Sequence, residues 1–179
     1  MLRGLRNRMK RDNEPRVLIL GLDNAGKTTI LNRLGVSEEN HTEAPEGPTQ
    51  GFNIMNVNRD GRRIKLCDLG GQRALRDFWE DYYANTDCIM YVVDSSDQRR
   101  LEEAHESFVE VVKGVPNVPV LVLANKQDLA TAKDPKTVAE ALQLSEYRDR
   151  SWHVQGCSAK SGNGLEEGLT WIFHACNVK

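Results

Sequence analysis

Short apolar runs alternate along this chain with longer segments in which apolar residues recur every three or four positions. Runs of this length are typical of strands, and the three-to-four spacing is typical of helices with one buried face. We predict strands near residues 16–21, 52–58, 63–68, 88–94, 119–125 and 152–157. We predict helices near residues 26–34, 75–84, 98–113, 135–143 and 164–176. Strands and helices that alternate in this way indicate an α/β fold, with a doubly wound, mostly parallel sheet between layers of helices.

The chain of 179 residues suits one domain with a full core, which we place at residues 15–179. Residues 1–14 differ in composition, because the first eleven positions hold five basic residues and no acidic one. Leu2, Leu5 and Met9 share one helical face there. We interpret residues 1–14 as a basic amphipathic arm that could contact a membrane weakly, and a flexible charged tail is the alternative.

Charge and cysteine content narrow the class of protein. The net charge is −2, so subtracting the five positive charges of residues 1–11 leaves −7 for the remainder, which argues against a nucleic-acid binder. The four cysteines are widely spaced and show no metal-binding pattern. Without a signal peptide or a long apolar run, the simple interpretation is a reduced cytoplasmic protein.

The pattern Gly-x4-Gly-Lys-Thr occupies residues 21–28, between a predicted strand and a predicted helix. In that context backbone N–H groups and a helix N-terminus form an anion site, which we call the phosphate loop. Lys27 would add charge for the β- and γ-phosphates, and the Thr28 hydroxyl would ligate Mg²⁺. A glycine-rich turn with a solvated lysine is the alternative, and the flanking elements disfavour it. We therefore predict nucleotide contacts from Asp23, Asn24, Ala25, Gly26, Lys27, Thr28 and Thr29.

A second motif, Asp-Leu-Gly-Gly-Gln, follows a short strand and ends at Gln72. An aspartate at this place holds Mg²⁺ beside the phosphates, so we predict that Asp68 does so, through water. Gly71 would let the backbone approach the γ-phosphate, and Gln72 would orient an attacking water. Thr49 ends a polar segment over residues 36–51 and could complete the Mg²⁺ shell. Thr42 is a poorer candidate because it lies farther from the next strand.

The third motif, Asn125-Lys126-Gln127-Asp128, follows a continuously apolar run at residues 120–124. Such a run is typical of a strand covered on both faces, and ligands of open α/β sheets bind at the carboxyl ends of their strands. The Asp128 carboxylate can accept both N–H groups of the guanine Watson–Crick edge, which adenine does not offer. The alternative is an ordinary polar loop. Further along, Ser158 and Ala159 could donate backbone N–H groups to the guanine O6.

These motifs resemble those of the Arf and Arf-like family of Ras-like small GTPases, nearest to its Arf-like three branch. The segments that carry the resemblance are GLDNAGKTT from Gly21, PTQGFN from Pro48, DLGGQR from Asp68 and NKQDL from Asn125. It spans roughly residues 16–175. It implies a Ras-like P-loop domain whose six-stranded sheet has an antiparallel hairpin, turning at residues 59–62, at its edge. It also implies GTP or GDP with Mg²⁺ as ligands, slow GTP hydrolysis, and a role in trafficking, including lipidated cargo for cilia.

The resemblance implies protein partners as well. Effectors, exchange factors and activating proteins would contact two switch segments and the hairpin between them, where Phe52, Trp79 and Tyr82 could form an aromatic surface. A half-buried core position is an equal alternative for Trp79. Cys67 stands where the family has a tryptophan, so a partner that relies on that tryptophan is expected to bind weakly. In the family, the N-terminal arm occupies a groove in the GDP state and leaves it with GTP.

Two other functions fit fewer residues. A nucleotide-bound scaffold that never cycles would not need Gln72, Lys27 and Asp68 together. A P-loop kinase or ATPase has no reason to carry Asn125-Lys126-x-Asp128. The sequence therefore favours a GTP-hydrolysing switch.

Overall fold

The structure, a computed structural model, describes residues 14–35 and 52–177. The predicted arm, apart from Glu14, and the predicted magnesium ligand Thr49 lie outside these residues. The described part contains one sheet with strand order β2-β3-β1-β4-β5-β6. Its strands are β1 (Arg16–Leu20), β2 (Phe52–Arg59), β3 (Arg62–Leu69), β4 (Cys88–Asp94), β5 (Val120–Asn125) and β6 (Trp152–Gly156).

Every neighbouring pair of strands is parallel except β2 with β3, which are antiparallel. These two form the predicted edge hairpin, and Asp60 and Gly61 at its tip have φ values of 54° and 77°. A tight turn with positive φ at both central residues matches the right-handed twist of its strands, which is why an Asp-Gly pair suits this place. The six-stranded, mostly parallel sheet is therefore confirmed.

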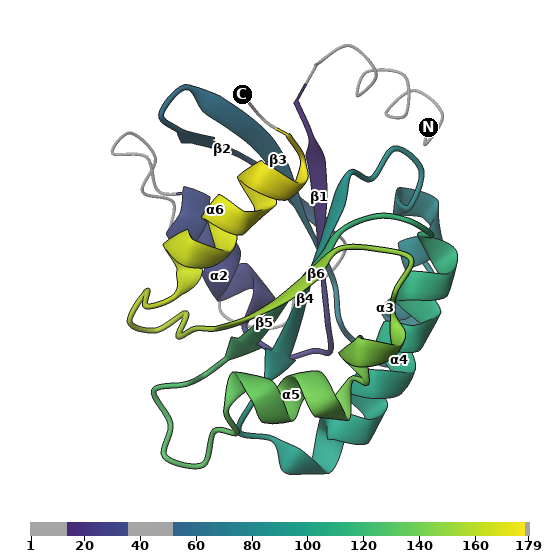
Figure 1. Cartoon of the computed structure of the whole chain (residues 1–179), viewed down its shortest axis with the longest axis vertical. Helices are drawn as coiled ribbons and strands as arrows, with labels where there is room; N and C mark the ends of the chain where they lie inside the picture. The colour runs from purple at the N-terminus through teal and green to yellow at the C-terminus, as the bar shows by residue number, and fades with distance from the viewer. Residues whose placement is uncertain (1–13, 36–51, 178–179) are drawn as a thin grey trace.

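Helices cover both faces of the sheet (Figure 1). The α-helices are α2 (Lys27–Gly35), α3 (Arg73–Arg76), α4 (Leu101–Gly114), α5 (Pro135–Ala141) and α6 (Leu165–Ala175). Short 3₁₀ turns are η2 (Trp79–Tyr82), η3 (Gln98–Arg100) and η4 (Leu144–Glu146). Helix α5 begins sharply because the Asp134 side chain accepts a hydrogen bond from the Thr137 N–H and Pro135 occupies the first turn.

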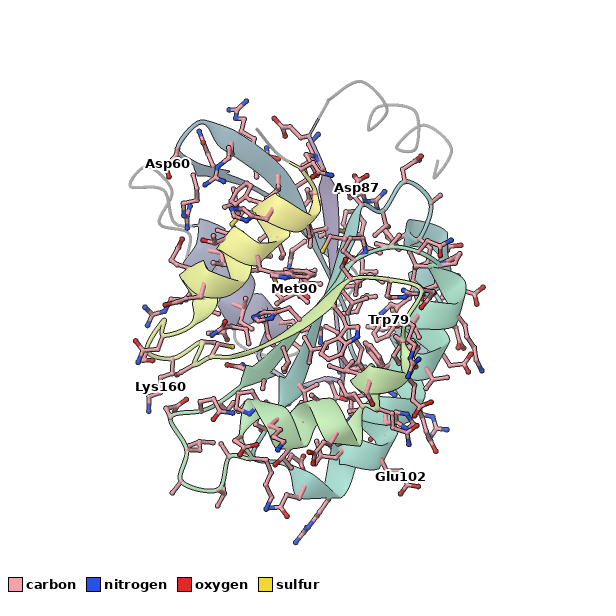
Figure 2. The ribbon with its side chains drawn as sticks, in the orientation of Figure 1. Asp60, Trp79, Asp87, Met90, Glu102 and Lys160 are labelled. Carbon is pink, nitrogen blue, oxygen red and sulfur yellow. The ribbon has the colours of Figure 1, made fainter. Side chains whose placement is uncertain are left out.

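The core has two halves because successive side chains of a strand point to opposite faces. Val17 and Ile19 of β1 pack with α2 and α6, whereas Leu18 and Leu20 pack with η2, α4 and α5. Met90 belongs to the first half and Trp79 to the second, and both are labelled in Figure 2. Because an apolar cluster packs against each face of the sheet, the sheet is a rigid base for the loops at the carboxyl ends of its strands.

The predicted helix at residues 75–84 is wrong as a single element. Helix α3 ends at Arg76 and a separate turn, η2, begins at Trp79. The Trp79 indole N–H donates to the Gly70 carbonyl oxygen at 2.9 Å, and the ring is 3% exposed. The free energy gained by burying this large side chain exceeds the free energy of a continuous helix, although residues 75–84 have adequate helix propensity. The helix predicted at 98–113 likewise starts as the turn η3 before α4. Within residues 14–35 and 52–177, no helix is long and apolar enough to cross a bilayer.

Candidate functional site

The phosphate loop connects the end of β1 to α2 and is shaped by three residues with positive φ: Gly21, Asn24 and Gly26. Gly26 has φ +98°, and a Cβ there would collide with the side-chain nitrogen of Asn125. The loop can therefore take this path, pressed against the loop after β5, only with glycine at this position. The predicted contacts at residues 23–29 form one continuous stretch from the loop into the first turn of α2.

Lys27, Thr28 and Asp68 place a cation, a hydroxyl and a carboxylate close together. Lys27 is 6% exposed, and its Nζ donates to the Leu22 carbonyl oxygen at 2.8 Å. Burial lowers the pKa of Lys27 to about 8, against the opposing effect of the charges of Asp68 and Asp23. The Thr28 Oγ1 donates to the Asp68 Oδ2 at 2.7 Å. An anion entering the loop would compensate the buried charge of Lys27.

The segment after β3 rests on the phosphate loop. The Asp23 backbone N–H donates to the Gly71 carbonyl oxygen at 3.1 Å. A Cβ on Gly71 would lie 2.5 Å from the Gly21 carbonyl oxygen and would also collide with the Lys27 amino group. Only glycine lets the two backbones come this close. Gln72 follows directly as the residue before α3 and is partly exposed, so it is the next residue after the contact between Gly71 and the phosphate loop.

Asn125 joins the phosphate loop to the loop after β6, and we call the region between these two loops the pocket. Its Nδ2 donates to the Ala25 carbonyl oxygen at 2.8 Å, and its Oδ1 accepts the Ala159 backbone N–H at 2.9 Å. Lys126 has φ 66°, and its Nζ reaches the Asn24 carbonyl oxygen at 2.8 Å and the Asp94 carboxylate at 2.7 Å. Segments 100 residues apart in sequence are thus bonded directly.

Asp128 and Ser158 meet at the other end of the pocket. The Ser158 Oγ donates to the Asp128 Oδ1 at 2.8 Å and accepts the Ser161 N–H at 3.1 Å, so the exposed carboxylate is held in one orientation. The Ser158 backbone N–H donates to the Asn163 carbonyl oxygen at 2.9 Å, while that of Ala159 donates to Asn125. Both amides are therefore paired here, and their contact with a guanine O6 stays a prediction.

Thr28 and Asp68 could supply two of the oxygen ligands of a hard cation, but not a complete coordination shell. Among the residues that the structure describes, no group of three or more His, Cys, Asp or Glu side chains could hold a metal ion. Thr28 and Asp68 supply two hard oxygen ligands at one point. Mg²⁺ in phosphate-binding sites typically uses one or two protein ligands and takes the rest from phosphate and water. The pair therefore fits Mg²⁺ that is bound together with a nucleotide.

Comparison with known proteins identifies the family. A sequence model of the ADP-ribosylation factor family matches residues 1–176. The chain belongs to this family. ADP-ribosylation factor-like protein 3 of Chlamydomonas reinhardtii is 47% identical over 175 residues, which cover 97% of this chain and 95% of that protein. The Caenorhabditis elegans protein of the same name is 43% identical, with 93% and 89% covered. The chain is thus an Arf-like small GTPase close to Arf-like protein 3.

A solved structure supports the fold. The Arl6 small GTPase of Trypanosoma brucei, determined with the bound nucleotide analogue GppNp, superposes with a TM-score of 0.82 at 30% identity. The match covers 92% of this chain and 98% of the other. Together with its sequence relatives, this match makes the Arf-family chain a GTP hydrolase with the Ras-like P-loop fold.

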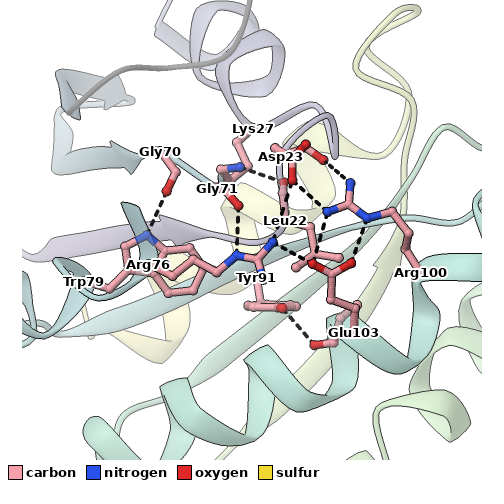
Figure 3. A network of polar contacts seen from close by, with 11 residues as sticks. Leu22, Asp23, Lys27, Gly70, Gly71, Arg76, Trp79, Tyr91, Arg100 and Glu103 are labelled. Carbon is pink, nitrogen blue, oxygen red and sulfur yellow. Dashed lines mark hydrogen bonds and ion pairs between the residues drawn. The ribbon is translucent and has the colours of Figure 1, made fainter. Parts of the chain in front are cut away.

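The Arf-family sequence did not reveal one feature, a cluster of four charged side chains behind the phosphate loop (Figure 3). Arg100 donates to the Asp23 carboxylate at 2.7 Å and to Glu103 at 3.0 Å. Arg76 donates to Glu103 at 2.9 Å and to the Gly71 carbonyl oxygen at 2.9 Å, and it lies 3.7 Å from Asp23. We call Asp23, Arg76, Arg100 and Glu103 the charged cluster. It joins the phosphate loop, the segment after β3 and α4.

The electrostatics of the cluster follow from these contacts. The hydrogen bond from Arg100 is the main cause that lowers the pKa of Asp23, and the same donor, with Arg76, lowers the pKa of Glu103 to about 2. Both carboxylates are therefore ionised at neutral pH. From sequence, Asp23 was expected only as a nucleotide contact, and nothing indicated that Arg100 and Arg76 would lie beside its carboxylate.

The predicted aromatic surface needs a correction. Phe52 is 41% exposed, and its ring centroid lies 5.7 Å from that of Tyr82. Trp79 is buried, so it belongs to the core rather than to this surface. Phe78, which the sequence did not single out, is 59% exposed. Cys67 is buried in the half of the core against which Tyr82 packs, and the Arg16 guanidinium lies 5.9 Å from the Tyr82 ring.

Proposed function

We propose that this Arf-family chain is a GTP/GDP switch that acts in intracellular trafficking. The observation that carries the proposal is the bonding of Asn125 to both Ala25 and Ala159. It holds a phosphate-binding loop and a loop with an oriented carboxylate at the two ends of one pocket. A relative of the same fold binds GppNp. A ligand with phosphates at one end and a guanine at the other is the chemistry that this pocket suits.

At the phosphate end, the loop amides and Lys27 would bind the β- and γ-phosphates, and Thr28 and Asp68 would hold Mg²⁺, with Thr49 as a further ligand outside the described residues. Bound Mg²⁺ would neutralise charge that develops on the phosphates. At the other end, Asp128 would accept the N1 and N2 hydrogens of guanine. Gln72 would orient the attacking water, and no step needs a covalent intermediate.

Switching would follow from the contact between Gly71 and Asp23. The Asp23 N–H now donates to Gly71, whereas in the GTP state a γ-phosphate would compete for groups at this place. The segment after β3 would then move, and with it η2 and Tyr82, which lie at the exposed Phe52. Effector and regulator proteins would bind this surface differently in the two nucleotide states. The similarity to Arf-like protein 3 supports release of lipidated cargo, for a cytoplasmic protein that could also reach cilia or membranes.

Nucleotide competition tests the proposal. Purified protein loaded with a fluorescent GDP is challenged with GTP, ATP and XTP, in the wild type and in Asp128→Asn. We expect the wild type to prefer GTP to ATP by at least a thousandfold. Asp128→Asn should weaken GTP by about a hundredfold or more and favour XTP relatively, because xanthine presents an acceptor at position 2.

Asp60→Asn is the matched control, since Asp60 is exposed at the hairpin tip and far from the pocket. It should leave all three affinities unchanged. Equal affinity of the wild type for ATP and GTP, or unchanged GTP binding in Asp128→Asn, would contradict the assignment of the guanine end.

A further inference from the structure

Two cysteines meet at the end of the sheet opposite the nucleotide pocket. Cys88 begins β4, and Cys176 caps the C-terminus of α6. The Cys176 Sγ lies 4.0 Å from the carbonyl oxygen of Asp87, the residue before Cys88. Cys88 is close enough to Cys176 to donate a hydrogen bond to its thiolate, whereas as thiols they donate to carbonyl oxygens, Cys88 to Ile89 and Cys176 to Asp87. Asp87 is labelled in the upper part of Figure 2, and Lys160, in the loop after β6, is labelled lower and to the left.

The surroundings of the two sulfur atoms differ. Cys88 is fully buried in the half of the core that α6 covers, and Cys176 packs against the same half but is only partly buried. An oxidant in solution therefore reaches Cys176 first. Cys88 is shielded from solvent, yet it is within contact of Cys176, which is the arrangement of a reactive cysteine and a resolving cysteine.

The pKa values of the thiols also indicate that Cys176 reacts first. The hydrogen bond from Cys88 lowers the pKa of the Cys176 thiol, despite the opposing effects of burial and of Asp87. Burial raises the pKa of Cys67 and raises that of Cys157 to about 12. The thiolate is the species that peroxides attack. Of the four cysteines, Cys176 is therefore both the most accessible and the one with the most thiolate.

We propose that Cys176 and Cys88 form a peroxide-sensitive thiol pair that closes to an intramolecular disulfide. The Cys176 thiolate attacks hydrogen peroxide, so an S–O bond forms, the O–O bond breaks and hydroxide leaves. The Cys176 sulfur is oxidised by two electrons to a sulfenic acid. The Cys88 sulfur then attacks it, so the S–S bond forms, the S–O bond breaks, and water leaves with the Cys88 proton. A small-molecule dithiol reverses the step.

The disulfide would join the residue that caps the C-terminus of α6 to the first residue of β4. It closes a loop of about 90 residues, which restricts the unfolded chain, so the oxidised protein should resist heat better than the reduced one. Neither cysteine contacts the phosphate loop or the Asp128 region, so nucleotide binding should be the same in both forms. This inference stands whether or not the proposed guanine site is correct.

The test uses full-length protein, treated with a small excess of hydrogen peroxide, alkylated, and analysed by mass spectrometry. We expect a mass loss of two hydrogens, a cross-linked peptide that contains Cys88 and Cys176, and free thiols at Cys67 and Cys157. The midpoint of thermal unfolding should rise by about 5 °C or more and return after dithiothreitol. Cys157→Ser is the matched control, and its cross-link and its rise in unfolding midpoint on oxidation should equal those of the wild type.

Two variants separate the steps. Cys88→Ser should accumulate a sulfenic acid at Cys176 that dimedone traps, whereas Cys176→Ser should give neither the adduct nor the cross-link. If Cys88→Ser does not fold, the alkylation rates of the native wild type serve instead, and Cys176 should react at least about tenfold faster than Cys67 or Cys157. The proposal is overturned by a cross-link through Cys67 or Cys157, by sulfinic acid at Cys176 without a cross-link, or by equal alkylation rates.

Discussion

The charged cluster makes a quantitative prediction about the choice between GTP and GDP. Arg100 neutralises Asp23 and turns its carboxylate toward α4. In Arg100→Gln, the negative charge would stand behind the phosphate loop without that partner. GTP carries more negative charge than GDP at its phosphate end, so GTP should lose more affinity. The quantity to follow is the ratio of the two dissociation constants rather than either constant alone.

The magnitude follows from the geometry. Two unit charges about 4 Å apart attract by about 4 kcal/mol at an effective dielectric constant of about 20. The Asp23 and Arg100 side chains are 35% and 30% exposed, so solvent screens the pair and about 1 kcal/mol is a realistic coupling. The same screening applies to the repulsion between an Asp23 without this partner and the additional negative charge of GTP, for which we also take about 1 kcal/mol. Because about 1.4 kcal/mol corresponds to a factor of ten, the preference for GTP over GDP should fall by about fivefold.

The assay is competitive displacement of a fluorescent GDP in Arg100→Gln, Asp23→Ala and the double variant. The double variant removes both charges and should return to within about twofold of the wild-type ratio. Lys113→Gln makes the same charge change on the exposed face of α4 and should have no effect. An unchanged ratio in Arg100→Gln, or a loss that persists in full in the double variant, would refute the coupling through Asp23.

Three further predictions concern the pocket. Gln72→Leu should bind GTP normally but hydrolyse it at least about tenfold more slowly, and a parallel loss of binding and single-turnover rate would remove Gln72 from its role. Nucleotide affinity should fall as the pH rises from about 7 to about 8.5, because burial lowers the pKa of Lys27 to about 8, so that near and above this pH phosphate binding requires Lys27 to take up a proton. Titration calorimetry in two buffers measures that proton, and a flat affinity with no proton uptake contradicts the idea. Asn125→Ala leaves the buried Ala25 carbonyl and Ala159 N–H without this partner, so unfolding of the nucleotide-free protein should cost about 2 kcal/mol less, and an unchanged melting temperature would show that the bridge adds no stability.

The sheet and the site loops were predictable because local patterns specify them. The strand at residues 120–124 is apolar throughout, and the glycines of the phosphate loop stand where the backbone needs positive φ. All six strands of the described part therefore lie within one residue of their predicted bounds. The break between helix α3 and turn η2 was not predictable, because it follows from the burial of the Trp79 ring in the core and its bond to Gly70, which helix periodicity does not contain.

The charged cluster could not be predicted from the sequence, because its members lie far apart in the chain. Arg100 and Asp23 are 77 positions apart, and Arg76 and Glu103 are 27 apart. In sequence, arginines and glutamates at the start of a helix are read as a solvated face, and only the fold brings them behind the phosphate loop. The same applies to Phe78 and Trp79, whose exposures are opposite although both are aromatic neighbours.

The hydrogen bonds of Asn125 and Lys126 to the phosphate loop are formed between groups of the protein alone. The distance between the two ends of the pocket is therefore set by the protein itself, and a nucleotide need not draw them together. Little ordering entropy is lost at these loops on association, which favours tight retention of whichever nucleotide is bound. A protein that speeds nucleotide release would therefore act on the segment after β3, where the Asp23 N–H donates to the Gly71 carbonyl oxygen, rather than on the loop that contacts the base.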